Sequence, residues 1–276
     1  MSKSIAPGLV FLLFSLINPG AATLIFDEDD SVPELMHGSL AIFYTYANII
    51  GEVQNDEVVK FEPNHTLVNH GFTGEWVQGL GNGFFARIDV PVIIEYDKAD
   101  GRSERTTSWG DPIISSKWVF VNSEEGPRAA FWAGTSIPTN GPESLGVPSP
   151  AAKLVGGLTA GPGRLIGNLG YTYIPTHDKL DRGDVIGYAV NYEVLAQPNL
   201  TFPIEIFGNY VAKDRYNGVV VSDSGSHFVY ASGCFAYTFL GAGLFTLCGG
   251  VMAPVVKQGF GDDFTYMPHL TLYYNF

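Results

Sequence analysis

Basic residues are scarce in this chain. It has 15 Lys plus Arg against 28 Asp plus Glu, a formal net charge of -13 and an isoelectric point near 4.7. Proteins that bind nucleic acid use clustered Lys and Arg to neutralise phosphates. The charge balance therefore disfavours that class, and we expect no nucleic-acid partner.

Long hydrophobic runs are also lacking, apart from one at the N-terminus. Lys3 precedes an apolar stretch from Ile5 to Ile17, and small residues follow as far as Ala22. A membrane-spanning helix needs roughly 20 apolar residues, so this run is too short to be one and is typical of a secretory signal. We predict that residues 1–22 are a signal peptide removed after Ala22, and that the protein is exported.

Cysteine is rare, with only Cys234 and Cys248. They stand seven residues on either side of Gly241, and an oxidising compartment permits a disulfide, so a cross-strand bond is one interpretation. Two unreacted thiols are the other. No His or carboxylate cluster with ligand spacing surrounds them, so we predict no metal and no other cofactor.

Alternating apolar and polar side chains are abundant by contrast, and the C-terminus shows this best. In Pro268–Phe276, four residues share an apolar phase: Leu270, Leu272, Tyr274 and Phe276. Strands alternate in this way when their two faces meet different media, and here one face suits lipid. The ending resembles the last strand of bacterial outer-membrane β-barrels, in which the terminal Phe serves as an assembly signal. The resemblance implies that Phe276 engages the barrel-assembly machinery.

The same alternation recurs along the chain, separated by connections that are alternately short and long. A membrane protein without a spanning helix must be a closed barrel, because hydrocarbon offers no partner to an open sheet edge. Short periplasmic turns and longer extracellular loops are typical of even-stranded barrels. We predict an all-β, transmembrane antiparallel up-and-down barrel over residues 38–276, preceded by an acidic lead or small plug at 23–37; fourteen or ten strands are near alternatives. The twelve expected strands are 38–50, 66–78, 84–96, 108–121, 128–138, 151–160, 164–175, 185–195, 200–213, 226–239, 243–252 and 264–276.

Aromatic residues of the outward phase gather at the strand ends, in two sets. Amphipathic rings favour the boundary between lipid and water, so a barrel should carry two such girdles. Core aromatics of a soluble β protein are the alternative, but a soluble sandwich has no reason to keep the rhythm of turns. The expected girdles are Tyr44, Tyr46, Tyr96, Tyr173, Tyr188, Tyr210 and Tyr266 at the long-loop end, and Trp76, Phe84, Trp118, Phe120, Phe239, Tyr274 and Phe276 at the short-turn end.

Charged side chains fall on the phase opposite to the lipid-facing one. Arg87, Asp89 and Glu95 share one parity in the third strand, where the apolar residues hold the other. A charge on the lipid face costs about 2–4 kcal/mol at the bilayer midplane, so these side chains should line the lumen. They would either rigidify the barrel as a compensated network or form a constriction that filters solutes. The predicted network comprises Glu75, Arg87, Asp89, Glu95, Asp111, Lys117, Arg128, Glu205 and Lys213.

Aromatic residues on the lumenal phase could contact a solute. Acidic and basic residues of that phase are nearly balanced, so no ring of one sign emerges and an ion-selective pore is disfavoured. Uncharged solutes fit better. The expected contact residues are Trp109, Trp132, Phe207, Phe228 and Tyr230.

One segment shows a family resemblance. The run G-D-x-x-x-x-x-K at Gly110–Lys117, followed by an alternating strand that ends near Ser136–Gly141, resembles the family named for the meta-pathway of phenol degradation, a family of outer-membrane transporters. The resemblance implies a barrel in the outer membrane of a Gram-negative bacterium, surrounded by outer-membrane lipid. It also implies passive uptake of small hydrophobic or aromatic compounds.

Two other functions remain open at this point. A structural or surface-interaction barrel would have a filled lumen and loops that bind another molecule. An outer-membrane hydrolase would need a nucleophile with a base in hydrogen-bond reach. None of the six histidines lies in a nucleophile motif such as G-x-S-x-G, so we predict no catalytic residues and no enzyme.

Overall fold

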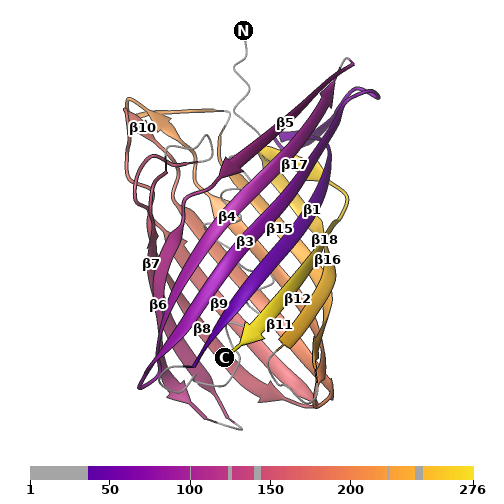
Figure 1. The fold of residues 1–276 in the computed structure, drawn as a ribbon. Coiled ribbons are helices and arrows are strands. Elements are labelled where there is room, and N and C mark those ends of the chain that lie inside the picture. Colours follow the sequence, from indigo (N-terminus) through magenta and orange to yellow (C-terminus); the bar gives the residue numbers. More distant parts are fainter. Residues whose placement is uncertain (1–36, 100, 124–125, 140–143, 223, 240–244) are drawn as a thin grey trace.

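The computed structural model describes residues 37–99, 101–123, 126–139, 144–222, 224–239 and 245–276. The predicted signal peptide and the acidic lead as far as residue 36 lie outside these ranges. Twelve antiparallel strands form a closed barrel (Figure 1), which confirms the predicted fold class and strand count. They are β1 (Gly38–Gln54), β3 (Thr66–Gly81), β4 (Phe84–Ala99), β6 (Ile113–Asn122), β7 (Arg128–Ser136), β8 (Pro150–Ala160), β9 (Gly163–Thr172), β11 (Val185–Gln197), β12 (Leu200–Val211), β15 (Ser226–Thr238), β16 (Phe245–Gly259) and β18 (Met267–Asn275).

The first and last strands pair with each other and close the barrel. β1 pairs with β3 on one side and with β18 on the other, from Ser39 opposite Asn275 to Thr45 opposite His269. At the end of this pair, Gly38 N donates to Phe276 O at 3.0 Å. The barrel therefore has no open edge among the described residues, and the C-terminus lies at the short-turn end (Figure 1).

A tight turn between β3 and β4 illustrates how the sequence sets this end of the barrel. Asn82 and Gly83 connect the paired residues Gly81 and Phe84, and both adopt positive φ, 52° and 79°. A two-residue type I′ hairpin requires positive φ at both positions, and Asn-Gly is the preferred pair.

At the opposite end, several strands continue beyond the barrel wall (Figure 1). The long connections predicted at 51–65 and 97–107 thus contain strand hairpins built on β1 and β4. Three short strands form a separate small sheet above the opening. These outer elements are β2 (Glu57–Lys60), β5 (Arg102–Trp109), β17 (Gly261–Phe264), β10 (Leu180–Asp181), β13 (Arg215–Tyr216) and β14 (Val219–Val220).

The predicted strand 108–121 is interrupted, and this corrects one expected site residue. β5 ends at Trp109 and β6 begins at Ile113; Gly110–Pro112 between them breaks the ladder, since proline has no N–H to donate. Because of this interruption, residues of the same parity before and after it face opposite sides of the wall: Trp109 is exposed and Ile113 is buried. Trp109 lies opposite the outward residue Val92 and is 58% exposed. Its assignment to the lumen was therefore wrong.

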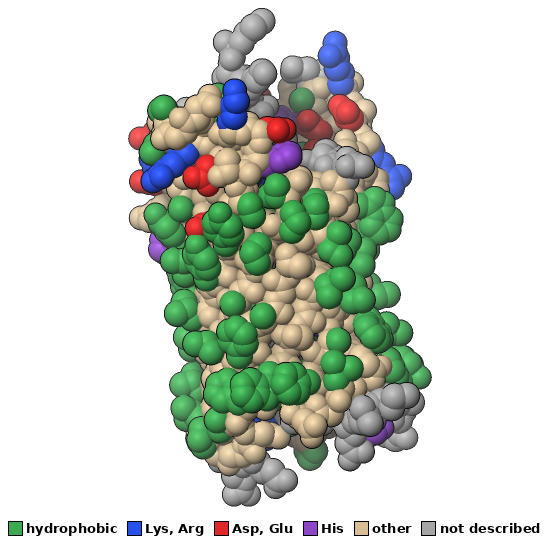
Figure 2. Space-filling model, turned by 90° about the vertical axis from the view of Figure 1, so that its left-hand side faces the viewer, with side chains coloured by type: hydrophobic (Ala, Val, Ile, Leu, Met, Phe, Trp, Pro, Cys, Tyr) green, Lys and Arg blue, Asp and Glu red, His purple; other side chains and the backbone are tan. Residues whose placement is uncertain are grey.

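The outer wall is apolar. On the face drawn in Figure 2, hydrophobic side chains are spread over the barrel wall, and Lys, Arg, Asp and Glu gather mostly at one end. Exposed aromatic side chains lie at both strand ends as predicted; Phe84 and Trp118 stack at the short-turn end with ring centroids 5.8 Å apart. No helix in the described ranges is long and apolar enough to cross a membrane.

Candidate functional site

Aromatic rings gather inside the barrel toward the long-loop end. Tyr230 on β15 is at their centre, with ring-centroid distances of 5.2 Å to Phe207, 6.2 Å to Phe228 and 5.9 Å to Phe264. All four side chains are buried. Three of the five expected contact residues thus come together. We call these four residues the aromatic shelf.

Sequence reasoning missed Phe264. Counting in twos from the C-terminus places it on the lipid face, with Leu270 and Tyr266. Thr265 and Tyr266 separate β17 from β18, and this two-residue break reverses the phase. A run of two aspartates just before Phe264 was the only hint that the lipid face had ended there.

Trp132 belongs to a second lumenal cluster. It packs with Leu145, which comes from the connection between β7 and β8. The described end of that connection, residues 144–149, therefore packs into the lumen through Leu145. The other members of the cluster are Ile113, Ile174, Val185 and Val211.

Asp111 holds this inward loop in place. Its Oδ1 accepts hydrogen bonds from Thr139 N at 2.7 Å and Thr139 Oγ1 at 3.1 Å, and its Oδ2 accepts one from Leu145 N at 3.0 Å. We had placed Asp111 in a lumenal network with Lys117. The break at Gly110–Pro112 instead removes it from the strand and turns its carboxylate toward backbone N–H groups.

Charged residues form a compact cluster inside β3 and β4, nearer the short-turn end. Arg87 Nη2 lies 2.8 Å from Glu75 Oε2, and Arg87 Nε lies 2.8 Å from Asp89 Oδ2. All three side chains are buried. The structure thus brings these three members of the predicted network together.

Across the lumen, three polar side chains follow one another on adjacent strands. Asn191 on β11 lies opposite Glu205 on β12, which in turn lies opposite Ser232 on β15. All three are buried. We call them the polar row. His269 on β18 lies beside it, with Nε2 3.4 Å from Ser232 Oγ. The sequence pattern predicts a lumenal position for Asn191, Glu205 and His269, and it includes Glu205 in the charged network; Ser232 is the residue that it does not name.

Lys117 and Glu95 lie apart from the Arg87 cluster. The Lys117 ammonium lies over the ring of Phe85, 5.7 Å from its centroid. Glu95 is half-buried near the long-loop end of β4, opposite Asn69. Neither forms an ion pair with another member of the predicted network among the contacts described.

Arg128 and Lys213 stand at the ends of the barrel. Arg128 begins β7, and its Nε donates to Ser123 O across a short turn at 2.8 Å. Lys213 lies beyond Val211, where β12 ends, and its Nζ donates to Ser222 O at 3.3 Å. The strand predicted to reach residue 213 is therefore too long. Lys213 belongs to an outer loop and not to a lumenal network.

Both cysteines are free thiols. Cys234 lies opposite Gly250 and Cys248 opposite Ala236, so the two are diagonal neighbours. The disulfide interpretation is corrected, because the hairpin is centred one residue later than Gly241 and the cysteines are not directly paired. Among the described residues, no group of three or more His, Cys, Asp or Glu side chains could hold a metal.

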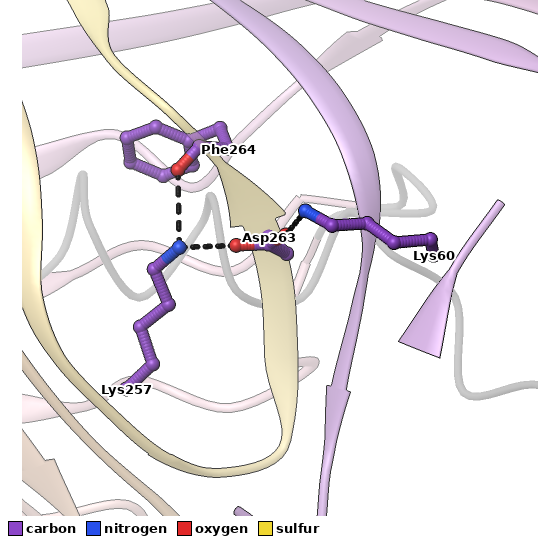
Figure 3. Close-up of polar contacts among 4 residues, drawn as sticks. All are labelled: Lys60, Lys257, Asp263 and Phe264. Atoms are coloured by element: carbon purple, nitrogen blue, oxygen red, sulfur yellow. Dashed lines mark hydrogen bonds and ion pairs between the residues drawn. The ribbon is translucent and has the colours of Figure 1, made fainter. Parts of the chain in front are cut away.

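An ion-paired cluster ties the outer hairpins together at the long-loop end (Figure 3). Asp263 on β17 accepts hydrogen bonds from Lys60 on β2 and from Lys257 on β16. Lys257 also donates to Phe264 O at 3.3 Å. Asp263 precedes the shelf residue Phe264 and lies opposite Gly51 of β1, so this cluster links β2, β16 and β17 next to the aromatic shelf.

The lysines shift the titration of this carboxyl group. Burial of Asp263 acts to raise its pKa, but the hydrogen bonds and charges of Lys257 and Lys60 outweigh it. The pKa of Asp263 is therefore lower than usual, and its charged form is favoured.

No family model and no curated protein sequence matches this chain. Solved structures do. An outer membrane channel from Pseudomonas putida F1 superposes with a TM-score of 0.75 at 10% identity, covering 90% of this chain and 98% of that one. The translocator domain of the autotransporter NalP from Neisseria meningitidis gives 0.57 at 8% identity, covering 96% of each chain. The NanC porin gives 0.54 at 8% identity, covering 85% of this chain and 98% of its own. This chain therefore has the fold of outer-membrane β-barrels.

Proposed function

We propose that this protein is a channel of the bacterial outer membrane for passive uptake of small hydrophobic or aromatic compounds. The observation that carries the proposal is the aromatic shelf inside the barrel, where Phe207, Tyr230 and Phe264 stack. The apolar outer wall supports a membrane location. The similar fold of the Pseudomonas putida channel and the resemblance of Gly110–Lys117 to the phenol meta-pathway family point the same way.

The chemistry of the shelf suits transient contact with an apolar solute. Burial of apolar surface stabilises a bound molecule by about 25 cal/mol per Å². Offset or edge stacking between rings adds about 0.5–1.5 kcal/mol. Interactions of this size favour entry, yet they are weak enough to let a small molecule leave, as conduction requires.

The ends of the chain have their own roles in this proposal. Residues 1–22 would direct export and be removed. Phe276 would be read by the assembly machinery before β18 pairs with β1, since in the folded barrel its backbone N donates to Gly38 O at 2.9 Å.

Solute flux into liposomes that contain the purified protein tests the proposal. We expect the protein to raise the entry rate of a small neutral aromatic above the rate in protein-free liposomes, and to raise the entry rate of a sugar or an inorganic ion of similar size less. The variant Tyr230→Ala should change aromatic flux, whereas Val190→Ala on the outer face should not. Entry of sugar and aromatic at equal rates would contradict an aromatic-selective channel.

A filled structural barrel is the second candidate. The observation in its favour is that the loop held by Asp111 packs Leu145 into the opening. In that case no solute should enter faster than it enters protein-free liposomes, with or without the Asp111→Ala substitution.

A further inference from the structure

Two members of the polar row have hydrogen-bonding capacity that the described residues do not use, whereas Ser232 Oγ lies 3.3 Å from Cys234 Sγ and 3.4 Å from His269 Nε2. Glu205 and Asn191 are each 1% exposed. Neither carboxylate oxygen of Glu205 and neither polar atom of the Asn191 side chain has a hydrogen-bond partner in the described structure. Buried polar groups are normally satisfied, and a buried charge without a hydrogen bond is especially costly. Because these groups lie on the lumenal face, their position points to a ligand that supplies the missing hydrogen-bond partners.

Two charged residues lie near enough to act electrostatically on Glu205: Lys153 and Glu193. Glu193 lies directly opposite Arg164 on β9. Lys153 on β8 holds its ammonium over the ring of Trp132, 5.5 Å from its centroid. Neither residue donates a hydrogen bond to Glu205 in the described structure, so its carboxylate can still accept hydrogen bonds from an ammonium group.

The neighbouring row on the same three strands is apolar. Ala189, Phe207 and Tyr230 lie opposite one another, two residues along from Asn191, Glu205 and Ser232, and they share the lumenal face. Two residues along a strand correspond to about 7 Å. The small Ala189 side chain leaves Phe207 and Tyr230 as the principal surface of this second row.

The two rows together match one kind of molecule. A primary ammonium group has three hydrogen-bond donors, and the polar row offers three acceptors: the Glu205 carboxylate, the Asn191 amide oxygen and the Ser232 hydroxyl. An ammonium group also interacts favourably with aromatic faces. An apolar body of one ring, attached by a short alkyl link, would span the distance to the shelf.

We propose that Asn191, Glu205 and Ser232, with Phe207 and Tyr230, form a lumenal binding site for small arylalkyl amines in their ammonium form. The site deepens the proposed uptake function and rests on it, because it names a substrate class for the same lumen. Glu205 pairs with the ammonium group, Asn191 and Ser232 accept its remaining hydrogens, and the two aromatic side chains contact the ring.

Binding to the purified, detergent-solubilised protein tests this site without any flux measurement. Titration calorimetry at pH 7 would compare 2-phenylethylammonium with 2-phenylethanol and phenylacetate, which have a neutral and an anionic head on a similar body. We expect the amine to bind at least about tenfold more tightly than the alcohol, and phenylacetate to bind more weakly than both.

Substitutions then assign the effect to the polar row. Glu205→Gln keeps the shape and removes the charge, and it should weaken amine binding about tenfold while leaving the alcohol unchanged. Ser232→Ala should give a smaller loss. The matched control is Glu95→Gln, a carboxylate on the opposite wall, which should bind the amine as the unsubstituted protein does. Heat-modified mobility on gels confirms that each variant is folded.

The outcomes separate this site from the channel itself. Equal affinities for amine and alcohol, or unchanged amine binding in Glu205→Gln, would overturn the site, even if toluene still enters liposomes. Loss of toluene flux with intact, Glu205-dependent amine binding would overturn the uptake function while leaving the binding site in place.

Discussion

At the scale of the residue, Glu205 and Arg87 show two ways of burying charge in one lumen. Arg87 contacts two carboxylates within 2.9 Å, so every charge in that cluster lies next to one of opposite sign. Glu205 faces the lumen with both oxygens unpartnered among the described residues. Compensated charges support the wall, whereas an uncompensated one lowers stability and is available to a ligand.

The variant Glu205→Gln should therefore stabilise the barrel. We expect the free energy of unfolding to rise, because the substitution removes a buried ionisable carboxyl group while the Gln amide stays as poorly hydrogen-bonded as the carboxyl group was. Urea unfolding in lipid vesicles, followed by tryptophan fluorescence, measures it. The contrasting variant Glu75→Gln weakens an ion pair with Arg87 and should destabilise. Equal losses in both variants would contradict the assignment of Glu205.

The ionisation of Asp263, at the long-loop end, predicts that the free energy of unfolding depends on pH. Its pKa is lowered by Lys257 and Lys60, so its contribution to stability is complete above the unfolded value of about 3.9 and is lost as the pH falls through the folded value. We expect the unsubstituted protein to be about 1–3 kcal/mol more stable than Asp263→Asn at pH 7. The difference should lie toward the lower end of this range, because the Lys60 side chain is 57% exposed and solvent screens its charge. The difference should vanish in stronger acid. Urea unfolding from pH 7 to 2 measures it, and a constant difference would refute the pairing.

At the scale of the element, Asp111 ties both described ends of the loop between β7 and β8 to the wall. Three hydrogen bonds reach that carboxylate from Thr139 and Leu145. Asp111→Ala should release the loop and make it more sensitive to protease added outside liposomes, because hydrogen bonds to a charged group contribute about 1.5–3 kcal/mol each. Glu104→Ala on the exposed face of β5 is the control and should leave cleavage unchanged. Identical cleavage of both variants would show that Leu145 packing alone holds the loop.

Turn glycines offer a second test at this scale. Gly83 has a φ of 79°, and a Cβ there would lie 2.6 Å from Val119 O. Gly101 has a φ of 73°, but nothing lies within 4 Å of such a Cβ. Gly101→Ala should cost about 1 kcal/mol from backbone strain alone, and Gly83→Ala should cost more. Refolding yield and urea unfolding compare them. If the two costs were equal, the contact with Val119 would be irrelevant.

At the scale of the whole molecule, the apolar wall predicts where charge is tolerated. Leu169, midway along β9, is 59% exposed, and Val219 in the outer small sheet is 70% exposed. Leu169→Arg should destabilise the barrel in lipid vesicles by about 2–4 kcal/mol, whereas Val219→Arg should be nearly neutral. Urea unfolding of both variants in vesicles measures the contrast. A water-facing barrel would tolerate both.

Much of this architecture was predictable from the sequence. Alternation is a local property, since successive side chains in a strand point to opposite faces. It placed all twelve barrel strands and put Glu75, Arg87 and Asp89 on the lumenal face, where the structure brings them together. Turn residues such as Asn82 and Gly83 are also read locally, because they need positive φ.

What the sequence alone determined is the periodicity of the strands and the positions of the turns, which depend on side chains close to each other in the chain. Only the tertiary structure decided the phase after an interruption. Trp109 and Phe264 each lie next to a break and face the side opposite to the one that counting predicts. The pairing of β15 with β16 set the register that keeps Cys234 and Cys248 from lying directly opposite each other. The hydrogen bond from Thr139 to Asp111 is likewise a contact between segments distant in the chain. These features depend on pairing between distant segments, which a local pattern does not specify.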